Sequence, residues 1–133
     1  MRLRAAAEVA LACAFVPLAL ETLSAARVLG AIGRLPARGL RADDPERLAA
    51  LVDRILYRLP WIWRHTCLRR AAVLASLLRR DGRDAEVVIG VRRAADGRLD
   101  AHAWLRCDGE EPYLESGDVA TFAVLRGPGH VAP

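Results

Sequence analysis

The chain contains no lysine, asparagine or glutamine, so arginine supplies all 20 of its basic side chains. Without lysine it can hold neither the phosphate-binding lysine of a P-loop nor a Schiff-base nucleophile. Without asparagine and glutamine, another residue type must orient any catalytic histidine, and no side-chain amide can hold an oxyanion. These absences exclude P-loop ATPases and Schiff-base aldolases.

Aromatic residues and cysteines are also scarce. Aromatics make up 5% of the chain, too few for platforms on which nucleic-acid bases stack. The net charge of +4 comes from arginines interleaved with acids, which is typical of solvated helix faces, so no nucleic-acid partner is expected. The three cysteines match no disulfide framework, and we therefore expect a reducing, cytoplasmic compartment.

The length of 133 residues predicts a single domain spanning residues 1–133, in which residues 1–40 form an N-terminal helical segment. The start of this segment superficially copies a signal peptide. Glu8 and Pro17 interrupt its apolar run, which is shorter than the roughly 20 residues that cross a bilayer. We expect a helix packed on its own domain or on a partner, with export as the alternative and no stable membrane insertion.

The rest of the chain changes from a helical to a strand period. One helix is predicted to begin at Pro45 after an Asp43 or Asp44 cap, and another to run from Cys67 to a Gly82 cap. Strands are then predicted over 85–91, 101–107 and 111–116. The fold class is therefore α+β, with N-terminal helices followed by a small antiparallel sheet.

Cys67 is the candidate nucleophile because it opens a helix. The positive end of the helix dipole and the unpaired N–H groups there stabilise a thiolate. A nucleophilic cysteine needs a histidine as base, and His102 lies on the predicted second strand.

A tight turn at Asp108-Gly109 would pair the second and third predicted strands. Facing residues then sum to 217, so His102 would face Glu115. On the same face of the sheet, Trp104 would lie opposite Tyr113 and Arg106 opposite Glu111, while the other face would be apolar. A carboxylate in that position can hold the imidazole of a Cys–His pair. A four-residue loop over 108–111 would shift the register, and His102 would then no longer face Glu115. Asp118 is the alternative orienting residue.

Other interpretations of these residues stay open. The cysteine and the histidine can simply be core residues, which is the commoner role of both. A zinc site could be assembled from four of the side chains, which are His65, Cys67, His102 and Cys107. His130 is expected to be solvated. Trp61 and Trp63 could line a substrate cleft or only pack beside the helix.

Three segments resemble the B-type leader peptidases of lasso-peptide biosynthesis, transglutaminase-like cysteine proteases of the microcin-maturation kind. These are WRHTCLRRAAVLASLLRRDG, AEVVIGVRR and DAHAWLRCDGEEPYLE. The resemblance implies a transglutaminase-like or papain-like core that removes the leader from a ribosomally made precursor, with no metal or cofactor. It also implies a separate leader-recognition protein, because the chain is too short to carry that domain, and a lasso cyclase.

Carried over residue by residue, the resemblance makes Cys67 the nucleophile, His102 the base and Glu115 the orienting acid. The family usually has aspartate in the last role, and glutamate is one methylene longer. The tryptophans Trp61, Trp63 and Trp104 are expected to bind substrate. Two rival functions remain, an acyltransferase with the same triad and a non-catalytic scaffold of the same fold.

Overall fold

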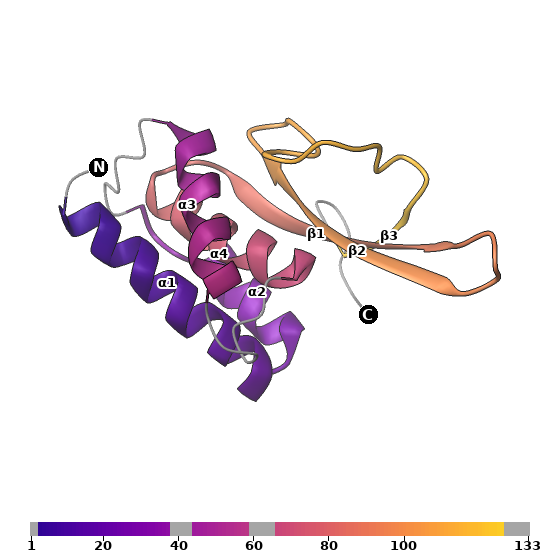
Figure 1. Cartoon of the computed structure of the whole chain (residues 1–133), viewed down its shortest axis with the longest axis horizontal. Coiled ribbons are helices and arrows are strands. Elements are labelled where there is room, and N and C mark those ends of the chain that lie inside the picture. The colour runs from indigo at the N-terminus through magenta and orange to yellow at the C-terminus, as the bar shows by residue number, and fades with distance from the viewer. Residues whose placement is uncertain (1–2, 38–43, 59–65, 127–133) are drawn as a thin grey trace.

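The computed structural model describes residues 3–37, 44–58 and 66–126, and within them it confirms the expected α+β class (Figure 1). Helices come first and an antiparallel sheet follows. The helices are α1 (Leu3–Thr22), α2 (Ala25–Gly33), α3 (Pro45–Arg58) and α4 (Cys67–Arg80). The strands are β1 (Ala85–Arg93), β2 (Leu99–Cys107) and β3 (Ala123–Arg126).

Helix α4 is the centre of the fold. Its residues 71–78 are all buried, and it contacts the other three helices as well as β1 and β2. In Figure 1 the helices gather at one end of the molecule, and the hairpin of β1 and β2 extends away from them. A helix buried on every side holds its first residue, Cys67, in a fixed place relative to the sheet.

The predicted cap of α3 is confirmed at Asp44. Its Oδ1 accepts the backbone N–H groups of Glu46 and Arg47 at 3.1 and 3.3 Å, and Pro45 is the first helical residue. Such a cap satisfies N–H groups that have no acceptor within the helix. The inner face of α3 is buried at Leu48, Ala49, Val52 and Leu56.

The N-terminal segment forms two helices. Ser24 separates them and caps α2 by accepting the Arg27 N–H at 3.3 Å. The inner face of α1, with Val9 and Cys13, lies in the core against α4, so the helix packs on its own domain.

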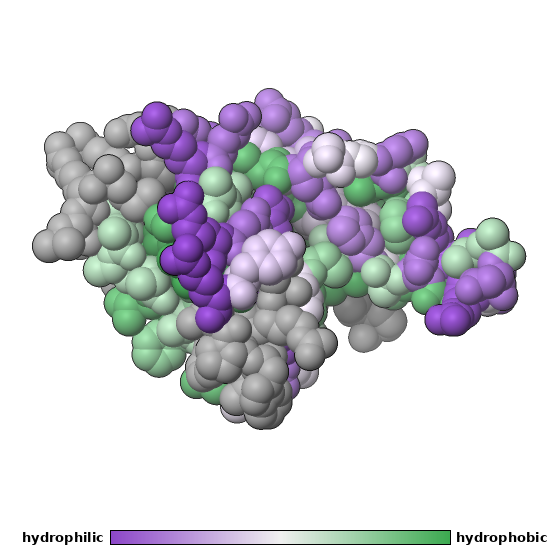
Figure 2. All heavy atoms as spheres, viewed as in Figure 1, coloured by the Kyte–Doolittle hydropathy of each residue, from purple (hydrophilic) through white to green (hydrophobic). Residues whose placement is uncertain are grey.

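The outer face of α1 is apolar and exposed. Leu11, Phe15 and Leu18 are 53%, 62% and 39% exposed, and Figure 2 shows green atoms at the lower left, where Figure 1 places this helix. By length and composition Ala5–Thr22 could cross a membrane, although core helices and signal sequences pass the same test.

The sheet has the order β2-β1-β3, with both neighbouring pairs antiparallel. The register of β1 and β2 places Gly90 opposite His102. Core residues such as Ala103 and Leu105 point toward the helices, whereas His102 and Trp104 alternate with them along β2.

The prediction of a strand over 111–116 is wrong. The turn itself is as expected, because Asp108 and Gly109 have φ of 50° and 88° and the Cys107 N–H donates to the Glu110 carbonyl at 3.0 Å. Pairing ends there, since Pro112 has no N–H to donate and Leu114, with φ of 59°, turns the chain. Residues 111–116 form a loop, and β3 pairs with the other edge of β1.

Candidate active site

Cys67 is the first residue of α4 and its side chain is exposed. Thr66 caps the helix, with its hydroxyl accepting the Arg69 N–H at 3.2 Å. The thiol therefore lies at the positive end of a helix of 14 residues, where backbone N–H groups point outward.

The other two cysteines are chemically different from Cys67. Cys13 and Cys107 are buried, and burial raises the pKa of each thiol to about 11. At neutral pH both are protonated and shielded. Among the three thiols, only that of Cys67 is open to a substrate.

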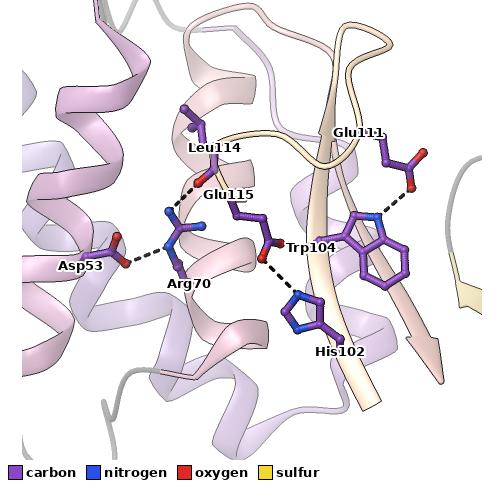
Figure 3. A network of polar contacts seen from close by, with 7 residues as sticks. All are labelled: Asp53, Arg70, His102, Trp104, Glu111, Leu114 and Glu115. Carbon is purple, nitrogen blue, oxygen red and sulfur yellow. Dashed lines mark hydrogen bonds and ion pairs between the residues drawn. The ribbon is translucent and has the colours of Figure 1, made fainter. Parts of the chain in front are cut away.

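His102 and Glu115 form a pair. The imidazole Nε2 lies 3.1 Å from the Glu115 Oε2, and the two side chains are 30% and 23% exposed (Figure 3). An ionised carboxylate only accepts hydrogen bonds, so Nε2 donates and Nδ1 is left as an acceptor. This tautomer suits a histidine that takes a proton from a thiol.

An aromatic stack supports the imidazole. The His102 ring lies 5.8 Å from the Trp104 ring at an interplanar angle of 26°, and Phe122 lies 5.8 and 5.7 Å from these two rings. Gly90 makes room for the stack, because a Cβ there would lie 2.6 Å from the Trp104 ring. The small residue of β1 and the large residue of β2 therefore fit together behind the candidate base.

Three contacts hold the loop that carries Glu115. The Trp104 Nε1 donates to Glu111 at 2.7 Å, and the Tyr113 N–H donates to the Leu105 carbonyl at 2.8 Å. Arg70 donates to the Leu114 carbonyl, also at 2.8 Å (Figure 3). The loop thus stays beside β2 without a strand ladder.

Cys67, His102 and Glu115 line one cleft of about 500 Å³. They come from three segments that are distant in the sequence, namely the start of α4, the middle of β2 and the loop after β2. Trp104 lines the same cleft, although only 1% of it is exposed. An exposed thiol, an oriented imidazole and a carboxylate around one hollow can perform nucleophilic catalysis on a carbonyl compound.

Of the three side-chain pairs expected on the face that carries His102, one is right and two are wrong. His102 does meet Glu115, but Trp104 bonds to Glu111 and not to Tyr113, and the expected pair of Arg106 with Glu111 is wrong for the same reason. Both errors follow from the missing strand.

Asp118, the alternative orienting residue, accepts the Ala120 N–H at 2.9 Å. Asp118 therefore stabilises its own turn. The carboxylate that contacts His102 is that of Glu115.

The zinc interpretation does not survive for Cys107. This residue lies five positions from His102 along β2, which is about 16 Å at 3.3 Å per residue, so one ion cannot bind both. Within residues 3–37, 44–58 and 66–126, no group of three or more His, Cys, Asp or Glu could hold a metal ion. Four of the candidate site residues lie outside the described ranges, and they are Trp61, Trp63, His65 and His130; the alternative cap Asp43 also lies outside them.

Sequence reasoning missed Arg70 and Asp53, whose side chains pair at 2.8 Å beside the cleft. A signal for Arg70 was present, because three residues after Cys67 is the same face of a helix. No local signal identifies Asp53, which meets Arg70 only through the packing of α3 on α4.

A family model described as the transglutaminase-like superfamily matches residues 5–127. Members of this superfamily are generally cysteine enzymes, commonly proteases or acyltransferases. No curated protein and no solved structure gave a match.

Proposed function

Because the chain belongs to the transglutaminase-like superfamily, we propose that it is a cysteine protease that removes the leader peptide from a ribosomally made lasso-peptide precursor. The observation that supports catalysis is the cleft shared by Cys67, His102 and Glu115. The choice of substrate rests on the resemblance of the segments around Cys67 and His102 to leader peptidases.

In the proposed acylation step, His102 Nδ1 takes the proton of the Cys67 thiol, and the sulfur attacks the carbonyl carbon of the last leader residue. The outward backbone N–H groups at the start of α4 stabilise the oxyanion. The imidazolium then gives its proton to the departing amine of the core peptide, and a thioester remains on Cys67.

Deacylation uses the same groups. His102 takes a proton from a water molecule, whose oxygen attacks the thioester carbonyl, and the leader leaves with a free carboxylate. The proton returns to the Cys67 sulfur. Glu115 keeps the imidazole in the productive tautomer and stabilises its charged form in both steps. The chemistry uses no cofactor and no metal.

The proposal includes two protein partners and a location. A separate leader-recognition protein delivers the precursor, and a lasso cyclase joins the freed amine to a side-chain carboxylate. We place the reaction in the cytoplasm, and we expect Trp61 and Trp63 to contact the peptide. Trp104, which was also expected to bind substrate, is only 1% exposed and instead packs against the His102 ring.

The test is to incubate the purified chain with a leader-containing precursor peptide, with and without the leader-recognition protein, and to follow products by mass. We expect cleavage at one site that is faster with the partner and abolished by Cys67→Ala. Cys13→Ala is the matched control. It removes a buried thiol of α1 that faces the hydrophobic core, so cleavage should stay intact.

The products separate the rival functions. Attachment of an added amine to the leader, in place of hydrolysis, would identify an acyltransferase, because the thioester is common to both reactions. If Cys67→Ala cleaves as fast as the wild type, the assignment of Cys67 is refuted.

A further inference from the structure

The loop that carries Glu115 borders three hollows. The first is the cleft with Cys67, the second, of about 730 Å³, lies against α3, and the third, of about 490 Å³, lies beside residues 117–119. Glu115 and Ser116 line all three. Ser116 is exposed and the Glu115 side chain is 23% exposed, so this part of the loop is not embedded in the apolar core and polar contacts must help to fix its position.

Leu114, directly before Glu115, has an unfavourable backbone conformation. Its φ of 59° lies in the left-handed region, which leucine rarely adopts. Such a conformation persists where surrounding contacts hold it. The apolar side chain of Leu114 packs partly against the core, and its carbonyl accepts the hydrogen bond from Arg70.

Arg70 connects three parts of the site. Its Nε donates to Asp53 Oδ1 on α3 and its Nη2 donates to the Leu114 carbonyl, both at 2.8 Å. In Figure 3 the guanidinium lies between these two partners, and the next residue, Glu115, reaches toward His102. The rigid fork of arginine can serve two acceptors in different directions at once, and the Asp53 carboxylate fixes its orientation.

We propose that Arg70, held by Asp53, is a positioning residue for the reaction, because it locks the Leu114 carbonyl and so keeps Glu115 on the imidazole of His102. Arg70 is three residues from Cys67 on the same helix, so one rigid element sets both the nucleophile and the loop that carries the acid. The inference rests on the proposed function, in which Glu115 orients His102.

The first test is a double-mutant cycle on cleavage of the precursor peptide in the presence of the leader-recognition protein. Arg70→Ala should lower kcat by about 10²-fold, the cost of a misplacement of about 1 Å, and leave KM within about twofold. In a Glu115→Ala background the same substitution should change kcat by less than about threefold, because the group through which Arg70 acts is gone.

Arg80→Ala is the matched control. It removes an arginine from the far end of α4, together with an ion pair to Glu8 of α1 at 3.8 Å, so it also weakens contacts between helices but does not touch the cleft. Its kcat should equal that of the wild type. If Arg70→Ala does not fold, Arg70→Lys replaces it. Lysine keeps the positive charge but cannot bond to both acceptors as the guanidinium does, so kcat should still fall, but by less than in Arg70→Ala.

The second test needs no substrate. Nitrogen-15 spectra of the His102 imidazole should show a single Nε2–H tautomer in the wild type and in Arg80→Ala, and a mixture of tautomers in Arg70→Ala. If the wild type cleaves no precursor, the proposed function fails, and these spectra still decide the role of Arg70. An unchanged tautomer in Arg70→Ala, or an equal loss of kcat with and without Glu115, would overturn the inference.

Discussion

Gly90 is the position at which packing most clearly predicts that a side chain would destabilise the fold. It lies on β1 opposite His102, and a Cβ there would lie 2.6 and 2.9 Å from two atoms of the Trp104 ring and 2.8 Å from the Phe122 Cβ. Its φ is not in the left-handed region, so space and not backbone strain is what excludes a side chain. Trp104 is only 1% exposed, so its ring has no open side into which it can move without cost.

Gly90→Ala should therefore lower the free energy of unfolding by about 1–3 kcal/mol, the usual cost of inserting a methyl group into a packed core. For a chain of this size that corresponds to a fall in Tm of about 4–11 °C. Because the Trp104 ring stacks on His102, its displacement should also move the imidazole and lower kcat by up to about 10²-fold.

Thermal unfolding followed by circular dichroism, together with the precursor cleavage assay, would test both effects. Gly33→Ala is the matched control, since a Cβ at this residue of α2 meets nothing within 4 Å and alanine favours a helix, so its Tm should be unchanged or higher. A Gly90→Ala variant with the Tm and the kcat of the wild type would refute the packing argument.

The remaining predictions concern titratable groups. Iodoacetamide at neutral pH should label Cys67 alone, and mass analysis that finds Cys13 or Cys107 modified in the folded chain would contradict their burial. Because both buried thiols have a pKa of about 11 in the folded chain against 9.0 when exposed, only the unfolded chain ionises as the pH rises from about 9 to 11. The free energy of unfolding, measured in urea, should therefore be steady below about pH 9 and fall between about pH 9 and 11. No fall in that range would show that the two thiols are solvated in the folded chain. Glu115→Ala should lower kcat by 10²-fold or more, about the range of a lost orienting group, while Asp118→Ala should keep it within about threefold; similar losses in both variants would make Asp118 part of the site.

The parts of the fold that depend on local signals were predictable. Asp44 and Pro45 mark the start of α3, and Asp108-Gly109 marks the tight turn, because each of these residue types acts on its own neighbours. Cys67 at a helix start was predicted in the same way, from the strongly helical period that begins directly after residues 61–66. Such signals need no knowledge of the rest of the chain.

Contacts between distant segments were not predictable in the same way. Residues 123–126 are a short apolar stretch, and nothing within it indicates that it pairs with β1 or at which edge of the sheet. The pair of His102 and Glu115 was predicted from a third strand paired with β2, and the structure has no strand there. The contact itself was nevertheless predicted correctly. The turn placed both residues close together, and other contacts complete the approach.

Those other contacts explain why the site does not need a third strand beside β2. A strand would fix Glu115 through a ladder of backbone hydrogen bonds, whereas the loop fixes it at separate points: Glu111 on Trp104, and Arg70 on the Leu114 carbonyl. Point anchors leave open space on both sides of the loop, which is where the three hollows lie. Glu115 can therefore reach His102 from an irregular loop while open space remains next to the candidate catalytic residues.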